Sequence, residues 1–415
     1  MKIERLKRNK LKKYGGIVLV FIAVIVTVVQ LSSRAKYRTT QSIELARGTI
    51  NYTVPDLNLV SMYVEDSGEY KASDTVPSNG YKLNQDKSYC AVNGNKDSSI
   101  TFDYSNGKIN VNNLTQKGTK CYLYFDSYAC KGISCESIMA NMKTIKTRND
   151  FSTTLTDTTT GVIYKSLNST QYDDHGETYY FAGAPTDNWV KFGGFYWRII
   201  RINGDGTIRM IYNGPTTDQT GETTGIGTST FNPSYNDNMY VGYQYTSGEV
   251  HGRGTDSTIK GVLDNWYNNN LSSYSNYIAT GEGATFCNNR TPYSGSGIGT
   301  SMTWYSQNKD LKCLDINDKF AFPIGLISKN EAVYAGGGEI VINTKYYLYT
   351  GQYYWTISPS GYDDVNSLVF VLQDSGALGN HSTFATFGVR PVINLKSDIS
   401  FTGGNGTSAN PYILS

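Results

Sequence analysis

The sequence predicts an α+β protein with an N-terminal transmembrane helix, a small all-β module and a larger α+β domain. Residues 14–33 form one apolar stretch, residues 50–127 alternate short apolar runs with turn residues, and residues 161–400 mix hairpin and amphipathic helix patterns. We divide the chain into a cytoplasmic basic tail (1–13), an anchor (14–33), a juxtamembrane segment (34–49), a β-rich module (50–127), a linker with a short helix (128–160), an α+β surface domain (161–400) and a C-terminal strand-like tail (401–415).

The apolar stretch of residues 14–33 approaches the roughly 20 residues that span a bilayer. Basic residues dominate on its N-terminal side, which predicts a cytoplasmic N-terminus and places the rest of the chain outside a single-pass cell membrane anchor. A cleaved secretory signal is the first alternative, because Ser33-Arg34-Ala35 offers a weak cleavage site. We favour the anchor because the arginine inside that site is poor for processing. A pilin-like helix that assembles into a polymer is the second alternative.

The charge balance argues against a nucleic-acid partner. The whole chain carries a formal charge of +2, but seven of its 37 basic residues and only one of its 35 acidic residues lie in residues 1–13. The remainder is therefore weakly acidic, whereas nucleic-acid-binding domains are basic. The whole chain contains 42 glycines, 34 tyrosines and 17% charged residues. This composition predicts a polar, uncharged surface that is rich in aromatic side chains.

An even number of cysteines in an extracytoplasmic chain predicts disulfides rather than a metal site. No histidine lies beside the Cys-x4-Cys pair, and the other spacings match no zinc pattern. Proximity along the chain favours three pairs, each of which closes a loop inside one module: Cys90 with Cys121, Cys130 with Cys135, and Cys287 with Cys313. The sequence predicts no metal and no cofactor.

Strand and helix patterns place the main elements. Alternating residues on both sides of Ser105-Asn106-Gly107 predict a hairpin in the small module. The larger domain opens with a second hairpin, whose turn is Asn203-Gly204-Asp205-Gly206, and continues with a helix that begins after Ser257. Three residues are expected to have structural roles in this domain: Trp197, Trp266 and Arg390.

The larger domain resembles a known family. The segments that carry the resemblance are FYWRIIRINGDGTIRMIYNG, VLDNWYNNNL, FPIGLISKNEAVYAGG, YYWTISPSG and GVRPVINLKSD. Together they are similar to a domain family of unknown function on the surfaces of Gram-positive gut bacteria. That family looks like a distant variant of the C-type-lectin-like fold that formylglycine-generating enzymes share. The resemblance implies an α+β fold with loops gathered at one end and implies no activity, and the lectin calcium motifs and the oxidase cysteines are both missing here.

The sequence favours a binding protein over an enzyme. The three histidines lie in polar segments without a catalytic motif, and the paired carboxylates Asp173-Asp174 and Asp363-Asp364 are adjacent, so they point apart on an extended chain. We therefore expect no catalytic residue and an adhesin-like surface protein that binds a glycan or a protein. A cell-wall hydrolase and a pilin-like subunit are the alternatives. The candidate ligand-binding residues are aromatic residues of the polar loops: Tyr235, Tyr240, Tyr243, Tyr245, Tyr353 and Trp355.

Overall fold

The computed structural model describes residues 49–51, 59–66, 68–78, 80–105, 107–114, 118–292, 294–295, 297–304, 311–313, 315–316 and 319–414. The chain divides into two compact units. Unit 1 comprises Met1–Asn79 and Ser88–Tyr124, and unit 2 comprises Gly80–Lys87 and Phe125–Ser415.

Unit 1 is built from strands. One sheet has the order β3-β2-β9-β5-β6 and the other has the order β1-β8-β7. The hairpin predicted around Gly107 is confirmed: in the pairing of β7 with β8, Thr101 lies opposite Asn112 and Ser105 lies opposite Lys108. Gly107 takes the positive φ that the turn requires. The strands are β1 (Thr49–Asn51), β2 (Leu59–Asp66), β3 (Glu69–Ser73), β5 (Tyr89–Val92), β6 (Asn95–Asp97), β7 (Thr101–Ser105), β8 (Lys108–Asn112) and β9 (Lys120–Ser127), whose last three residues belong to unit 2.

Unit 2 contains a nine-stranded sheet of order β10-β12-β13-β16-β15-β30-β29, in which β17 pairs with both β16 and β28. The hairpin predicted around Asn203–Gly206 is confirmed as the pairing of β16 with β17. The strands are β10 (Thr144–Thr147), β12 (Val162–Lys165), β13 (Tyr179–Tyr180), β15 (Trp189–Phe192), β16 (Phe195–Ile202), β17 (Ile208–Tyr212), β28 (Val392–Leu395), β29 (Phe401–Gly403) and β30 (Tyr412–Leu414).

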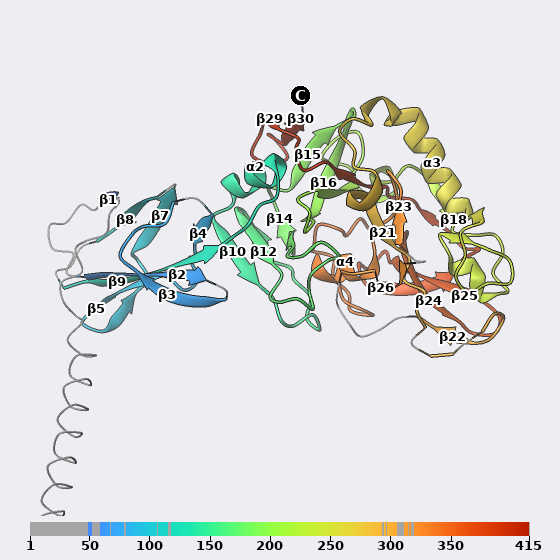
Figure 1. Ribbon diagram of the computed structural model, residues 1–415, viewed down its shortest axis with the longest axis horizontal. Helices are drawn as coiled ribbons and strands as arrows, with labels where there is room; N and C mark the ends of the chain where they lie inside the picture. Colours follow the sequence, from blue (N-terminus) through green and yellow to red (C-terminus); the bar gives the residue numbers. More distant parts are fainter. Residues whose placement is uncertain are drawn as a thin grey trace, which may run out of the picture. The chain divides into compact units, whose positions relative to one another are not determined.

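A second sheet of unit 2 has the order β18-β27-β24-β25-β26, and β22 pairs with β24. Figure 1 shows β24, β25 and β26 side by side in this sheet. Its strands are β18 (Thr228–Thr230), β22 (Met302–Thr303), β24 (Tyr354–Tyr362), β25 (Ser367–Leu372), β26 (Leu378–Ser382) and β27 (Thr386–Gly388). The short strands elsewhere in unit 2 are β4 (Tyr81–Leu83), β11 (Thr158–Thr159), β14 (Ala184–Pro185), β19 (Gln244–Tyr245), β20 (Thr255–Asp256), β21 (Thr285–Cys287) and β23 (Lys319–Ala321).

Helices are few and short. Among the described residues the α-helices are α2 (Ile133–Asn141), α3 (Thr258–Asn270) and α4 (Lys329–Tyr334). The described 3-10 turns are η1 (Gly221–Thr224), η2 (Asn238–Val241), η3 (Ser272–Tyr274) and η4 (Gly281–Ala284). The helix predicted after Ser257 is confirmed: the Ser257 hydroxyl caps α3, and Ile259 and Leu263 are buried on its inner face. Figure 1 shows α3 on the outside of unit 2.

The predicted α+β class is wrong, because the protein is mostly β. Each α-helix is too short to form a layer of its own beside two sheets of nine and six strands. The predicted transmembrane helix is also not supported: no described helix has the length and apolar character to cross a membrane. Residues 14–33, where we predicted that helix, lie outside the described residues.

Residues 128–160 and 401–415, which we expected to be a linker and a tail, are parts of unit 2. Helix α2 buries Ile138 and Met139 in the main hydrophobic cluster of unit 2. Strand β10 pairs in parallel with β12, and β30 pairs in parallel with β15. Each segment therefore contributes at least one strand to the nine-stranded sheet.

The three predicted disulfides are confirmed. Cys90 is bonded to Cys121, Cys130 to Cys135, and Cys287 to Cys313, and no free cysteine remains. The first bond joins β5 to β9 at directly paired positions of unit 1, and the other two lie in unit 2. Each closes a loop within one unit, where a disulfide stabilises by roughly 2–4 kcal/mol.

Candidate functional site

Five partly exposed aromatic side chains of unit 2 form a pair, Tyr235 with Phe384, and a triad of Tyr353, His381 and Phe387. Segment 381–387 contributes to both groups, and we call the five side chains together the aromatic strip. Tyr235 and Phe384 are 39% and 49% exposed, and their ring centroids lie 4.7 Å apart. The rings of Tyr353, His381 and Phe387 form a triad with centroid separations of 4.9–5.5 Å. Large exposed aromatic side chains that gather in this way mark an interaction site more often than single ones do.

Buried neighbours hold the strip in place. Trp355 is fully buried, donates its indole N–H to the Ser229 carbonyl at 2.8 Å and packs against Phe387 at 5.2 Å. Strand β18 pairs with β27, which places Ser229 opposite Phe387. The strip therefore lies on a packed core, so its rings need little ordering when a ligand binds.

The exposed pair is fixed by backbone hydrogen bonds on both sides. Thr383 is buried, its carbonyl accepts the N–H of Phe231 at 2.9 Å, and its hydroxyl donates to the Ser234 carbonyl at 3.0 Å. The Tyr235 carbonyl in turn accepts the N–H of Ser367 at 2.7 Å. Phe384 therefore directly follows the hydrogen-bonded Thr383, and Tyr235 lies in a loop that is hydrogen-bonded to β25.

A small pocket that is open to solvent lies next to Tyr353 at the other end of the strip. The exposed side chains of Glu222 and Gln352 have no partner among the described residues, so a carboxylate and a carboxamide remain available to a ligand. Besides Arg390, the polar and aromatic side chains of its wall are Glu222, Thr224, Thr228, Thr350, Gln352, Tyr353 and Tyr354. An aromatic face beside several hydroxyl and amide groups is suited to a polyhydroxylated ligand.

Arg390 also borders this pocket, but its side chain is buried and hydrogen-bonded inside unit 2. It is 1% exposed, and its guanidinium donates to the Tyr212 carbonyl at 3.0 Å and to the Leu348 carbonyl at 3.2 Å. These two carbonyls belong to β17 and to the segment before β24. The guanidinium also lies 4.8 Å from the centroid of the Tyr354 ring.

The structure separates the predicted ligand-binding residues into three groups. Tyr235 and Tyr353 belong to the strip. Tyr240 and Tyr245 are half-buried and contact each other edge to face at 5.4 Å, with no ring contact to the strip. Tyr243 and Trp355 are fully buried, so we correct their assignment: both are core residues that no ligand reaches in this structure.

The two tryptophans that we expected to be structural do pack into unit 2. Trp197 is fully buried and donates its indole N–H to the Phe192 carbonyl at 3.0 Å. Trp266 of α3 packs against it with a centroid separation of 6.3 Å and against Tyr212 at 5.4 Å. These contacts attach α3 to the β16–β17 hairpin.

Phe384, Phe387 and His381 were missed as site residues. Their sequence signal is the run HSTFATF, in which three rings recur every third position within small polar residues. That spacing matches neither the strand period of 2 nor a long helical pattern, so the sequence alone gave no reason to bring them together.

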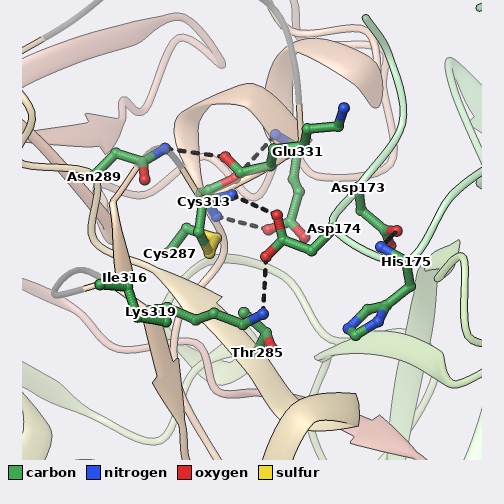
Figure 2. The surroundings of a disulfide bond; sticks show 12 residues. Asp173, Asp174, His175, Thr285, Cys287, Asn289, Cys313, Ile316, Lys319 and Glu331 are labelled. Atoms are coloured by element: carbon green, nitrogen blue, oxygen red, sulfur yellow. Dashed lines mark hydrogen bonds and ion pairs between the residues drawn. A yellow bond between two sulfur atoms is a disulfide. The ribbon is translucent and has the colours of Figure 1, made fainter. Parts of the chain in front are cut away.

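A second small pocket lies beside the Cys287–Cys313 disulfide and is lined by charged groups. Figure 2 shows Asp174 between Cys313 and Lys319: its carboxylate accepts the Cys313 backbone N–H at 3.2 Å and pairs with the Lys319 ammonium at 3.2 Å. His175 lies beside them, and its Nε2 is 3.3 Å from the Glu282 carbonyl.

A buried charge network, which we call the Glu331 network, contributes Asp173 and Arg201 to the wall of this second pocket. Arg201 pairs with Asp173 at 2.8 Å and with Glu331 at 3.0 Å, and Arg209 also pairs with Glu331. Burial alone would raise the pKa of Glu331, but Arg209 and Arg201 outweigh burial and hold the pKa of that carboxyl below its usual value. Since the carboxylates of this network are engaged by cations, we assign it a structural role.

Within the described part of the chain, no grouping of three or more His, Cys, Asp or Glu side chains could hold a metal ion. No protein-family model, curated protein or solved structure matches this chain. The resemblance to a Gram-positive surface family and to the C-type-lectin-like fold therefore stays a prediction.

Proposed function

We propose that this chain is an exported, non-catalytic cell-surface protein that binds a glycan on the aromatic strip of unit 2. The observation that carries the proposal is the set of partly exposed rings: the Tyr235–Phe384 pair, and the triad of Tyr353, His381 and Phe387 with the pocket beside Tyr353. The three disulfides support an oxidising compartment, because such bonds persist outside the cytosol.

Physical chemistry favours a glycan over an extended protein surface. The strip offers apolar ring faces for the C–H surfaces of sugar rings, and the pocket offers a carboxylate, a carboxamide and hydroxyls for sugar hydroxyls. A protein partner would in general need about 800 Å² of contact on each side, which is more than the five partly exposed rings of the strip present by themselves. A few rigid rings with nearby polar groups suit a short, hydroxyl-rich chain.

An oligosaccharide binding screen with the full-length chain tests the proposal. We expect saturable binding that Tyr235→Ala weakens roughly 5- to 30-fold, since an aromatic contact contributes about 1–2 kcal/mol. Tyr274→Ala is the matched control, because Tyr274 is 37% exposed and lies outside the strip. Equal affinities for Tyr235→Ala and wild type would remove the strip as the site. A screen without any glycan ligand, together with binding to a protein, would overturn the glycan proposal itself.

A further inference from the structure

We propose that the pocket beside Tyr353 binds the acetamido group of an N-acetylated sugar, an inference that rests on the proposed function and names its ligand class more narrowly. The pocket is lined by two exposed polar side chains, those of Glu222 and Gln352, and by the buried cation of Arg390. Together these groups favour a neutral amide over a charged group.

Backbone hydrogen bonds between separate segments fix the shape of the pocket. The Gly221 N–H donates to the Thr350 carbonyl at 2.9 Å, which holds η1 against the segment before β24. The Gly388 N–H donates to the Tyr353 carbonyl at 2.9 Å, and Thr228 of β18 lies opposite Gly388 of β27. A ligand group can therefore enter the pocket without first ordering a loop, which lowers the cost of binding.

The size and position of the pocket suit a substituent of a sugar ring. The pocket is small, so it accepts a group of a few atoms rather than a whole sugar ring. Tyr353 belongs both to the aromatic strip and to the pocket wall, and its ring stacks on Phe387 with a centroid separation of 5.0 Å. A sugar that packs against Tyr353 can therefore direct one of its substituents into the pocket.

The side chains of Glu222 and Gln352 lie beside the same stretch of η1. A methyl group added at Gly221, the residue before Glu222, would lie 3.7 Å from Cγ and 3.9 Å from Nε2 of Gln352. Both side chains are exposed, and neither has a partner among the described residues. A carboxylate accepts hydrogen bonds and a carboxamide also donates them, so the two side chains can bind the N–H and the C=O of one amide.

Arg390 adds a buried positive charge to the wall of the pocket. Its guanidinium is 1% exposed and donates to the carbonyls of Tyr212 and Leu348 and to Oδ1 of Asn213. These acceptors are neutral, and no carboxylate in the described part of the chain forms an ion pair with Arg390. A group in the pocket therefore meets a positive charge from Arg390 and a negative charge from Glu222.

An acetamido group suits both charges at once. It is a neutral dipole of about 3.5 D, like a peptide unit, so it can turn its N–H toward Glu222 and its carbonyl toward Arg390 and Gln352. Arg390 would repel a free ammonium group, and Glu222 would repel a carboxylate. The preferred ligand class is therefore an N-acetylated oligosaccharide rather than one with free amines or acid groups.

Three matched β-1,4-linked hexamers test the inference in calorimetric titrations of the full-length chain: those of N-acetylglucosamine, glucosamine and glucose. We expect the N-acetylglucosamine hexamer to bind about tenfold or more tightly than the glucose hexamer, since two hydrogen bonds, one of them to a charged group, suffice for that ratio. The glucosamine hexamer should bind no more tightly than the glucose hexamer.

The double substitution Glu222→Ala and Gln352→Ala should lower the affinity for the N-acetylglucosamine hexamer to that for the glucose hexamer. Both side chains are exposed, so their truncation should leave the fold intact. Glu282→Ala with Gln85→Ala is the matched control, because it truncates an exposed acid and an exposed amide outside the strip and its pocket. The control should leave the preference for the N-acetylated hexamer unchanged.

The outcomes separate the two proposals. If the glucose or the glucosamine hexamer binds as tightly as the N-acetylglucosamine hexamer, the inference is overturned and the proposed function stands. A preference for the N-acetylated hexamer that survives the substitution of Glu222 and Gln352 would also overturn the inference. If none of the three hexamers binds, the acetamido site is refuted, and the wider oligosaccharide screen decides the proposed function.

Discussion

The Glu331 network should be the most sensitive electrostatic element of unit 2, and Glu331→Gln isolates its charge. Glu331 is almost fully buried and is the partner of both Arg201 and Arg209. Its Oε2 also accepts the Ser328 N–H at 2.8 Å in the capping box of α4, and glutamine can keep that hydrogen bond. The substitution therefore removes a charge and leaves the helix cap.

The magnitude follows from what remains buried. Arg209 loses its carboxylate partner and keeps a hydrogen bond to the Thr285 carbonyl at 3.1 Å and a stacking contact with Phe286 at 4.3 Å, neither of which neutralises it. Breaking a buried ion pair by removing one partner costs about 3–5 kcal/mol. At about 2 °C per kcal/mol for a unit of this size, the melting temperature should fall by about 6–10 °C.

Tryptophan fluorescence during urea denaturation measures this effect in the full-length chain, because all five tryptophans lie in unit 2. Glu282→Gln, which replaces an exposed carboxylate, should change the free energy of unfolding by less than about 0.5 kcal/mol. If Glu331→Gln lowers the free energy of unfolding by less than about 1 kcal/mol, the reasoning is refuted, because Arg209 would then be solvated or paired in another way.

Two further predictions concern the stability of unit 2. Because the pKa of Glu331 is lowered in the folded protein, the stability that its charge contributes is present above the ordinary pKa of 4.5 and is lost as the pH falls through the folded pKa. The difference in unfolding free energy between wild type and Glu331→Gln should therefore shrink below about pH 4 in urea titrations from pH 7 to 3. A difference that is independent of pH would contradict this. Ser257→Ala should lower the unfolding free energy of unit 2 by about 1 kcal/mol, because Ser257 caps α3 and its hydroxyl donates to the Tyr243 carbonyl at 2.8 Å. Thr258→Ala, at the exposed neighbouring position, should be close to neutral in the same urea titrations at pH 7.

The sequence was sufficient where one local signal determines the structure. Alternation around a glycine turn predicted the β7–β8 and β16–β17 hairpins, and Ser257 before an amphipathic run predicted α3. The disulfides followed from proximity along the chain. The fold class failed because short helical patterns were given the same weight as strands, although most of the chain pairs into sheets.

Long-range pairing was beyond the reach of local patterns. Strand β30 lies beside β15, and β10 lies beside β12, because each buries its face in the common sheet, and no residue in these segments signals its partner. The same limit applies to the site. Tyr235 is exposed and Tyr243 is buried within one tyrosine-rich loop, and their composition does not distinguish them.

The central claim, that unit 2 binds a glycan on the aromatic strip, is tested most directly by calorimetric titration of two matched double variants with the glycan that the screen selects. Tyr235→Ala with Phe384→Ala removes a ring pair of the strip, and Tyr240→Ala with Tyr245→Ala removes a ring pair outside it. The account predicts an affinity loss of tenfold or more for the first variant and less than twofold for the second. Equal losses, or a larger loss for the second variant, would contradict it.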